Sequence, residues 1–230
     1  MTLDLIDWWK TEFGEAEIKG VASAIRQGNV SQGEITQHFE KKLGEYLGVP
    51  HVIATSSGTT ALMLALMAIG ISPGDEVIVP NRTWISTAHA PLCLGAKVIL
   101  ADVESKRPLI GCEYLDGLIS KKTKAIILVH LNGRAANVSE TQRIVEGKDI
   151  AVIEDAAQAI GSRNSIGLLG TQSDVGCFSL SVAKTFGTGQ GGFAITKNDE
   201  IAYRLRAMRT HGVENVKDPQ RWVMPGLNFR

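Results

Sequence analysis

The sequence predicts an α/β domain, built on one mainly parallel sheet that is sandwiched by helices. Two observations predict it. From residue 51 onward, short runs rich in β-branched residues alternate with runs of helical character. The β-rich runs are apolar along their whole length, which is typical of parallel strands buried on both faces. We therefore expect helices to connect the strands and to cover the sheet.

Two helices are predicted before this alternation begins, at residues 15–27 and 33–47. Ser31 and Glu34 predict a capping box at the start of the second helix. We expect residues 1–48 to form a helical segment that packs on the large domain. The second helix places apolar residues on one face at every fourth position, namely Ile35, Phe39, Leu43 and Leu47.

The remaining residues, 49–230, are expected to form the large domain. Its predicted strands are HVIAT, EVIVP, KVILADV, KAIILVH and IAVIED, which begin at residues 51, 76, 97, 124 and 150. Helical segments follow the first two strands, as TALMLALMAIG and as residues 84–94. In such sheets ligands bind at the carboxyl ends of the strands, so we expect the chemistry at those ends.

Composition and charge narrow the class of protein. The chain has 230 residues, of which 44% are hydrophobic and 21% charged, as in an ordinary globular protein. The 24 basic and 24 acidic residues cancel, so the charge gives no reason to expect nucleic acid in place of a small molecule. No apolar run reaches the roughly 18 residues that span a membrane.

The N-terminal stretch and the cysteines of the chain predict a cytoplasmic location. The N-terminal stretch MTLDLIDWWK has acids where a signal peptide would have bases. The three cysteines are scattered and lack C-x-x-C spacing, which suits a reducing compartment. The five histidines also lie far apart, so we expect no metal site.

The first predicted strand runs through a polar turn into a helix, in the sequence ATSSGTTALMLAL. Free backbone N–H groups and the positive end of the helix dipole make such a turn an anion site. The hydroxyls of Ser57 and Thr59, beside the backbone of Gly58, could bind a phosphate. Taken by itself, the turn is explained as simply by helix capping.

The next two informative strand ends carry an aromatic residue and two acids. Trp84 could stack on a planar ring, although core or interface packing explains a lone tryptophan as well. Glu154 and Asp155 end an apolar strand, where a charge is costly unless it is paired. Asp155 could cap a short helix after it, or could face the protonated ring nitrogen of pyridoxal phosphate. Gln158 lies one helical turn further on and could reach the same ligand.

The fourth strand end is FSLSVAKTFGTGQGG, in which Lys184 precedes four glycines. A phosphate-binding P-loop places its glycines before the lysine, so Lys184 has another role. A lone loop lysine is most simply a solvated charge. At this position, Lys184 could instead condense with an aldehyde to form a Schiff base, while Ser179 binds a phosphate. The four strand ends together indicate a pyridoxal phosphate site.

These motifs resemble the DegT/DnrJ/StrS family of pyridoxal-phosphate-dependent sugar aminotransferases, which have aspartate aminotransferase fold type I. The resemblance includes SSGTTAL, GDEVIVPNRTWISTA, VHLNG, IEDAAQA, CFSLSVAKTFGTGQGG, LRAMRTHG and GLNFR. It implies that Lys184 carries the cofactor and that Asp155 meets the pyridine nitrogen. It also implies cofactor-binding roles for Gly58, Thr59 and Ser179 at the phosphate, Trp84 on the ring, Gln158 near the ring hydroxyl and Asn228 at the phosphate of the neighbouring subunit.

The resemblance implies transfer of an amino group from glutamate or glutamine to a nucleotide-linked keto-deoxysugar, in aminosugar or surface-polysaccharide (lipopolysaccharide) biosynthesis. A free keto sugar acid is the alternative acceptor, and a non-catalytic pyridoxal-phosphate-binding protein is the alternative function. A homodimer with shared active sites is implied, together with truncation before a C-terminal small domain. Ser181, Gln190 and Asn132 depart from the family pattern, so no single sugar is selected.

Two other classes of enzyme fit the sequence poorly. One branch of the family has a histidine in place of the lysine and dehydrates its substrate, and Lys184 argues against that branch. A nicotinamide-dependent Rossmann enzyme would need G-x-G-x-x-G after the first strand, which SSGTTAL does not supply.

Overall fold

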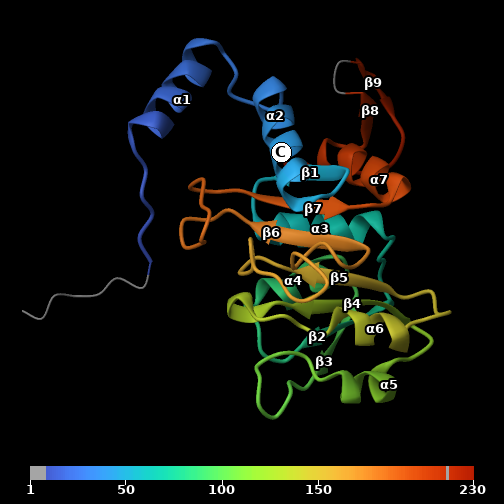
Figure 1. Ribbon diagram of the computed structural model, residues 1–230. Helices are drawn as coiled ribbons and strands as arrows, with labels where there is room; N and C mark the ends of the chain where they lie inside the picture. The colour runs from blue at the N-terminus through green and yellow to red at the C-terminus, as the bar shows by residue number, and fades with distance from the viewer. Residues whose placement is uncertain (1–8, 216–217) are drawn as a thin grey trace, which may run out of the picture.

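The computed structural model describes residues 9–215 and 218–230 (Figure 1). Within these ranges, seven strands form one sheet in the order β1-β7-β6-β5-β4-β2-β3. The strands are β1 (His51–Thr55), β2 (Glu76–Pro80), β3 (Lys97–Ala101), β4 (Thr123–Val129), β5 (Ala151–Asp155), β6 (Val175–Ser179) and β7 (Gly192–Thr196).

The sheet is mainly parallel, as expected. All pairs from β3 to β6 are parallel, and β7 alone runs antiparallel to its neighbours β1 and β6. β7 was not predicted, because it follows the glycine cluster without a helix in between. Two further short strands, β8 (Val213–Asn215) and β9 (Asp218–Trp222), form a separate antiparallel pair.

Helices cover both faces of the sheet, which confirms the predicted layers. The helices of the described chain are α1 (Glu15–Arg26), α2 (Glu34–Leu47), α3 (Gly58–Ala68), α4 (Ser86–Cys93), α5 (Leu115–Leu118), α6 (Val138–Ile144) and α7 (Asp199–Arg209), of which α1 does not take part in this covering. Two 3₁₀ turns, Cys112–Tyr114 and Leu131–Gly133, lie between them. Among the described helices, none has the length and apolar character required to cross a membrane.

The alternation of side chains along β5 shows how the layers are divided. Ile153 packs in a core cluster with α3, α4 and α7, whereas Val152 packs in a second cluster with α5 and α6. Successive residues of a strand point to opposite faces, so Asp155 points to the face that α3 and α4 cover. Glu154 points to the other face. The two acids that end β5 are therefore separated by the sheet.

The N-terminal helices form where they were predicted but differ from the prediction in their details. The predicted capping box of Ser31 and Glu34 is wrong, because α2 begins at Glu34 itself and is preceded by Gly33. Glu34 is then the first helical residue, where its side chain cannot complete the box. Leu43 and Leu47 are buried as expected, whereas Ile35 is exposed. α1 buries none of its residues and stands away from the sheet (Figure 1).

Candidate active site

The predicted site lies at one edge of the sheet. β1, β2, β5 and β6 all run in the same direction, so their carboxyl ends meet at this edge. The loop with Lys184 follows β6 there and lies between the sheet and α1 in Figure 1. Topology therefore brings together four segments that are far apart in the sequence.

The turn between β1 and α3 forms a close-packed cradle with β6 and β7. A Cβ on Gly58 would lie 2.8 Å from Cβ of Ser179, and one on Gly192 would lie 2.4 Å from the carbonyl carbon of Ser57. Only glycine fits at either place. As a result, Gly58, the first residue of α3, packs directly against the Ser179 side chain, so an anion at this helix start could meet both the backbone N–H groups and the Ser179 hydroxyl.

The structure shows the capping role of one residue in this turn. Ser57 is the N-cap of α3, since its Oγ accepts from the backbone N–H of Thr60 at 3.1 Å. The capping interpretation is therefore correct for Ser57. Thr59 makes a different contact, because its Oγ1 donates to Oγ of Ser86 at 2.9 Å. This bond ties the start of α3 to the first turn of α4.

Asp155 is a buried acid whose carboxylate accepts two hydrogen bonds. Its side chain accepts from the Thr87 hydroxyl at 2.8 Å and from the Ala157 N–H at 3.2 Å. Burial raises the pKa of Asp155 above its ordinary value, while the bonds from Thr87 and Ala157 and the charge of Lys184 act in the opposite direction. A cation at this carboxylate would offset the cost of its burial.

The segment after Asp155 differs from expectation. It forms turns and contains no helix, so Asp155 does not cap a helix, and its bond to Ala157 closes a local turn. Gln158 lies in these turns, where its Oε1 accepts from the backbone N–H of Asn132 at 2.8 Å. Asn132 has a left-handed backbone (φ 53°) that aims this N–H at Gln158. The amide nitrogen of Gln158 is thereby left to donate to a ligand.

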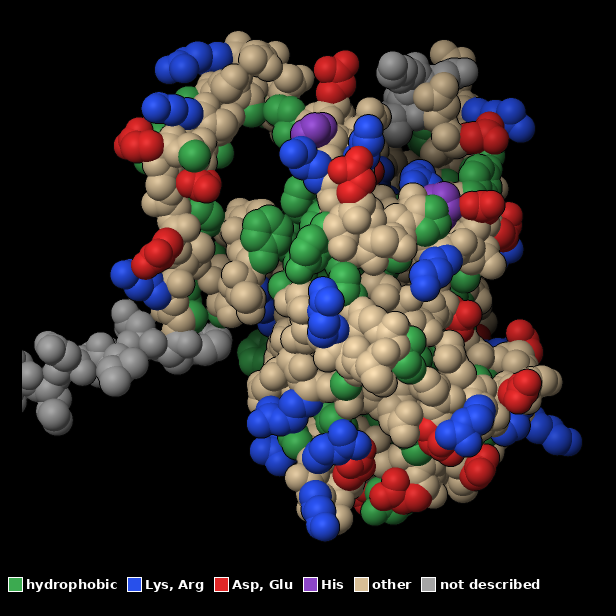
Figure 2. Space-filling model, viewed as in Figure 1, with side chains coloured by type: hydrophobic (Ala, Val, Ile, Leu, Met, Phe, Trp, Pro, Cys, Tyr) green, Lys and Arg blue, Asp and Glu red, His purple; other side chains and the backbone are tan. Residues whose placement is uncertain are grey.

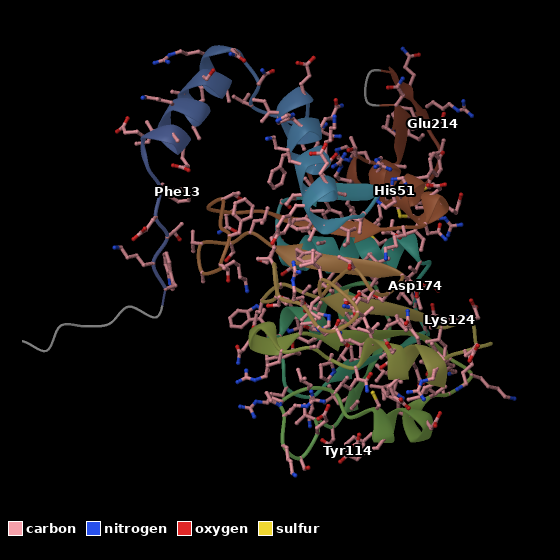
Figure 3. The ribbon with its side chains drawn as sticks, in the orientation of Figure 1. Phe13, His51, Tyr114, Lys124, Asp174 and Glu214 are labelled. Carbon is pink, nitrogen blue, oxygen red and sulfur yellow. The ribbon has the colours of Figure 1, made fainter. Side chains whose placement is uncertain are left out.

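Lys184 is partly buried in the loop after β6. Burial lowers the pKa of its amine, and the negative charge of Asp155 opposes this shift. A larger fraction of neutral amine makes the lysine a better nucleophile toward an aldehyde. The same loop touches the N-terminal segment, because the Thr11 hydroxyl donates to the carbonyl of Val182 at 2.5 Å. Phe13, labelled in Figure 3, lies on that segment.

The last two predicted site residues, Trp84 and Asn228, are both exposed. Trp84 lies two residues before α4 and is 70% exposed, which rules out core packing in this chain and leaves the ring open to a planar ligand or a partner. Asn228 is exposed, pairs with Thr210 in an isolated bridge and accepts from Arg230 at 3.2 Å. No contact within the described ranges joins Asn228 to Lys184 or Asp155.

Sequence reasoning missed the contacts of Thr87 and of His130. Thr87 is fully buried and bonds Asp155 across 68 residues of sequence, so no local pattern shows the pair. His130 and Glu154 form a buried pair behind the site, with 2.9 Å between Nε2 and Oε1. The pair could have been suspected from the sequence, because a histidine and an acid lie at the ends of two predicted strands that follow each other along the chain. No group of three or more His, Cys, Asp or Glu residues in the described ranges could hold a metal ion.

The residues fit one known cofactor. A phosphate would meet the cradle of Gly58 and Ser179, a ring cation would meet Asp155, and an aldehyde would meet Lys184. Pyridoxal phosphate has these three groups on one ring. The fold and the site define the chain as the cofactor-binding part of a pyridoxal-phosphate-dependent protein of aspartate aminotransferase fold type I.

Comparison with known proteins narrows this class. Residues 11–230 match the DegT/DnrJ/EryC1/StrS aminotransferase family, and the chain belongs to that family. GDP-perosamine synthase of Caulobacter vibrioides is 38% identical over 203 residues, which are 87% of this chain and 54% of that protein. The chain spans about half the length of the curated relatives it matches.

Solved structures agree with this assignment and with the expected cofactor. A DegT DnrJ EryC1 StrS aminotransferase from Brucella abortus is 36% identical, with a TM-score of 0.86 over 94% of this chain and 60% of that one. Spr1654 from Streptococcus pneumoniae, in its PLP form, is 27% identical, with a TM-score of 0.89 over 96% of this chain and 62% of that one. The predicted family and fold are therefore confirmed.

Proposed function

We propose that the protein is an aminotransferase that uses pyridoxal phosphate to move an amino group from glutamate or glutamine to a keto-sugar. The observation that carries the proposal is a buried carboxylate and a partly buried lysine at one edge of the sheet. Asp155 and Lys184 lie close enough for each charge to act on the pKa of the other. These are the acid for the ring nitrogen and the amine for the aldehyde that the cofactor requires.

Each residue has a defined task in this proposal. When bound, pyridoxal phosphate supplies an electron sink for the carbon that loses a proton. Asp155 balances the positive charge of the ring nitrogen. Lys184 would hold the cofactor through Nζ, and its free amine would take up and return the proton of the donor's α-carbon as general base and acid. Gln158 would donate to the ring hydroxyl, and Trp84 would cover one face of the ring.

The proposed acceptor is a nucleotide-linked keto-deoxysugar. Support comes from the relative named GDP-perosamine synthase, which is 38% identical to this chain. The pathway would then be the synthesis of an aminosugar for a surface polysaccharide. A free keto sugar acid remains the alternative acceptor for the same chemistry. We also propose a cytoplasmic location, which the three unpaired cysteines of the described chain support.

We further propose a homodimer with shared active sites. Asn228 is exposed, and its contacts in the described chain are to Thr210 and Arg230, which leaves its side-chain amide free to serve a partner's phosphate. α1 carries an exposed apolar face as well, with Ile18 58%, Val21 61% and Ile25 62% exposed, and apolar side chains are visible along it in Figure 2. A second subunit would cover such a face, since contiguous exposed apolar surface marks interaction sites.

Two measurements test the proposed function. Addition of glutamate to the natural full-length protein should change the visible spectrum of the bound cofactor, whereas a non-catalytic binding protein should show no change. Mass spectrometry should then detect an aminated product when keto-sugars, free or nucleotide-linked, are incubated with glutamate. A spectrum that glutamate and glutamine leave unchanged would exclude the proposed transamination by these donors.

A further inference from the structure

Thr87 is a fully buried residue of α4 whose hydroxyl contacts the acid of the site. Its Oγ1 donates to Oδ2 of Asp155 at 2.8 Å. A hydroxyl has one hydrogen to donate, so the bond to the carboxylate occupies the whole donor capacity of Thr87. Its lone pairs remain able to accept a hydrogen bond from another group.

Thr83 supplies that hydrogen bond. Its Oγ1 lies 2.9 Å from Oγ1 of Thr87, four residues further along the chain. Because Thr87 donates to Asp155, the hydrogen between the two hydroxyls must come from Thr83. The result is a chain of two hydroxyls that ends on a carboxylate, in which each bond polarises the next.

The second oxygen of the carboxylate is held independently. Oδ1 of Asp155 accepts from the Ala157 N–H at 3.2 Å. Two donors on different oxygens fix both the position and the plane of the carboxylate. An ionised carboxylate offers about four acceptor sites, so capacity remains for a further N–H donor.

The same turn of α4 also reaches the phosphate cradle. Ser86 accepts from Thr59 at 2.9 Å, and Thr59 belongs to the turn that begins α3. Trp84 lies between Thr83 and Ser86 in the sequence. One turn of chain thus connects the ring-nitrogen acid, the exposed aromatic ring and the phosphate turn.

We propose that Thr87 is a positioning residue that aligns the Asp155 carboxylate with the ring nitrogen of the cofactor, and that Thr83 strengthens this bond through its own hydroxyl. The inference rests on the proposed role of Asp155. A hydrogen bond donated to the charged form of an acid favours that form, and bonds to ionised groups are the stronger kind. The bond from Thr87 acts against the rise in pKa that burial causes at Asp155.

Matched substitutions in the natural full-length protein test this role. Thr87→Val keeps the branched shape and removes the hydroxyl, whereas Thr87→Ser keeps the hydroxyl. Thr83→Val removes the hydroxyl that donates to Thr87 and leaves the bond from Thr87 to Asp155 in place. Thr141→Val serves as the control, because Thr141 is equally buried and donates to the backbone carbonyl of Asn137, the N-cap of α6, outside the site.

Two readouts report on the ring nitrogen without requiring turnover. One is the dissociation constant of pyridoxal phosphate, measured by titration of the apo-protein. The other is the ¹⁵N chemical shift of the ring nitrogen in bound, labelled pyridoxal phosphate. A residue that only supports the fold would change the melting temperature but would leave the ¹⁵N shift of the bound cofactor unchanged.

We expect Thr87→Val to weaken cofactor binding by about ten- to a hundredfold, as expected for a lost bond to a charged group. The ¹⁵N shift should move toward that of the unprotonated ring. In Thr87→Ser the dissociation constant and the ¹⁵N shift should stay close to those of the wild type. Thr83→Val should change both in the same direction as Thr87→Val, by a smaller amount.

The inference is wrong if Thr87→Val matches Thr141→Val in both readouts, or if Thr83→Val moves neither. Should Thr87→Val fail to fold, Thr83→Val still decides the matter, because Thr83 is only partly buried. Failure of the proposed transamination would look different, since glutamate and glutamine would then leave the spectrum of the cofactor bound to the wild-type protein unchanged.

Discussion

His130 and Glu154 form a fully buried hydrogen-bonded pair on the face of the sheet opposite to Asp155, with 2.9 Å between Nε2 and Oε1. Nδ1 of His130 accepts from the Ala136 N–H, so Nε2 carries the hydrogen that is donated to Glu154. Glu154 also accepts from the backbone N–H groups of Gly170 and Gln172. The pair therefore fastens the end of β5, next to Asp155, to the end of β4 and to the loop before β6.

The first prediction concerns stability in acid. Burial alone would raise the pKa of Glu154, but the hydrogen bonds from His130, Gln172 and Gly170 outweigh it and lower that pKa. A lowered folded-state pKa gives stability that is present above the unfolded-state value of about 4.3 and is lost as the pH falls below it. Glu154→Gln should flatten this part of the curve of unfolding free energy against pH, measured by urea titration. An unchanged curve would contradict the prediction.

The second prediction separates stability from activity at Asp155. Burial raises the pKa of Asp155, so at neutral pH its charge costs the apo-protein stability. Asp155→Asn should therefore leave the apo-protein at least as stable as the wild type at pH 7, while turnover falls strongly. If Asp155 only closed a turn, its replacement would cost about 1 kcal/mol, as for a lost cap, and leave the rate nearly intact. Melting temperature and turnover number together decide between the two.

The third prediction concerns the cradle at the start of α3. Gly58→Ala would place a Cβ 2.8 Å from Cβ of Ser179 and force the two segments apart. We expect a loss of about 1–3 kcal/mol in stability and a weaker affinity for pyridoxal phosphate. Gly20→Ala in α1 is the control, because its Cβ would meet nothing within 4 Å. Equal cofactor affinity in the two variants, measured by titration, would show that the cradle does not bind the phosphate.

The fourth prediction concerns the shared active site. Asn228→Ala and Lys184→Ala chains of the natural full-length protein should each be nearly inactive alone. After subunit exchange, some mixed dimers would have one site with both residues intact, so activity should rise above that of either parent. Light scattering should give the mass of a dimer. No rise in activity despite proven exchange would refute shared sites.

The order of strands and helices could be predicted because the apolar runs and the turns between them are local signals. The antiparallel β7 could not, since its direction depends on pairing with β1 and β6 and is not encoded in its own residues. The start of α2 was predicted to within one residue, but its capping box was not, because Gly33 rather than Ser31 precedes the helix.

The residues of the candidate site that lie at the ends of predicted strands could be inferred from the sequence. Lys184 and Asp155 could be inferred because an acid after an apolar strand and a lysine before glycines are unusual there. Thr87 could not be inferred, because an ordinary threonine becomes informative only when the fold brings it to 2.8 Å from Asp155.

The proposed role of Lys184 is tested most directly by locating the cofactor on the chain. Pyridoxal phosphate should be reduced onto the natural full-length protein with borohydride, and the labelled peptide should be mapped by mass spectrometry. The protein should be yellow before reduction, and the label should lie on Lys184 and be missing from Lys184→Ala. A label on another lysine, such as Lys197, would contradict the proposed role.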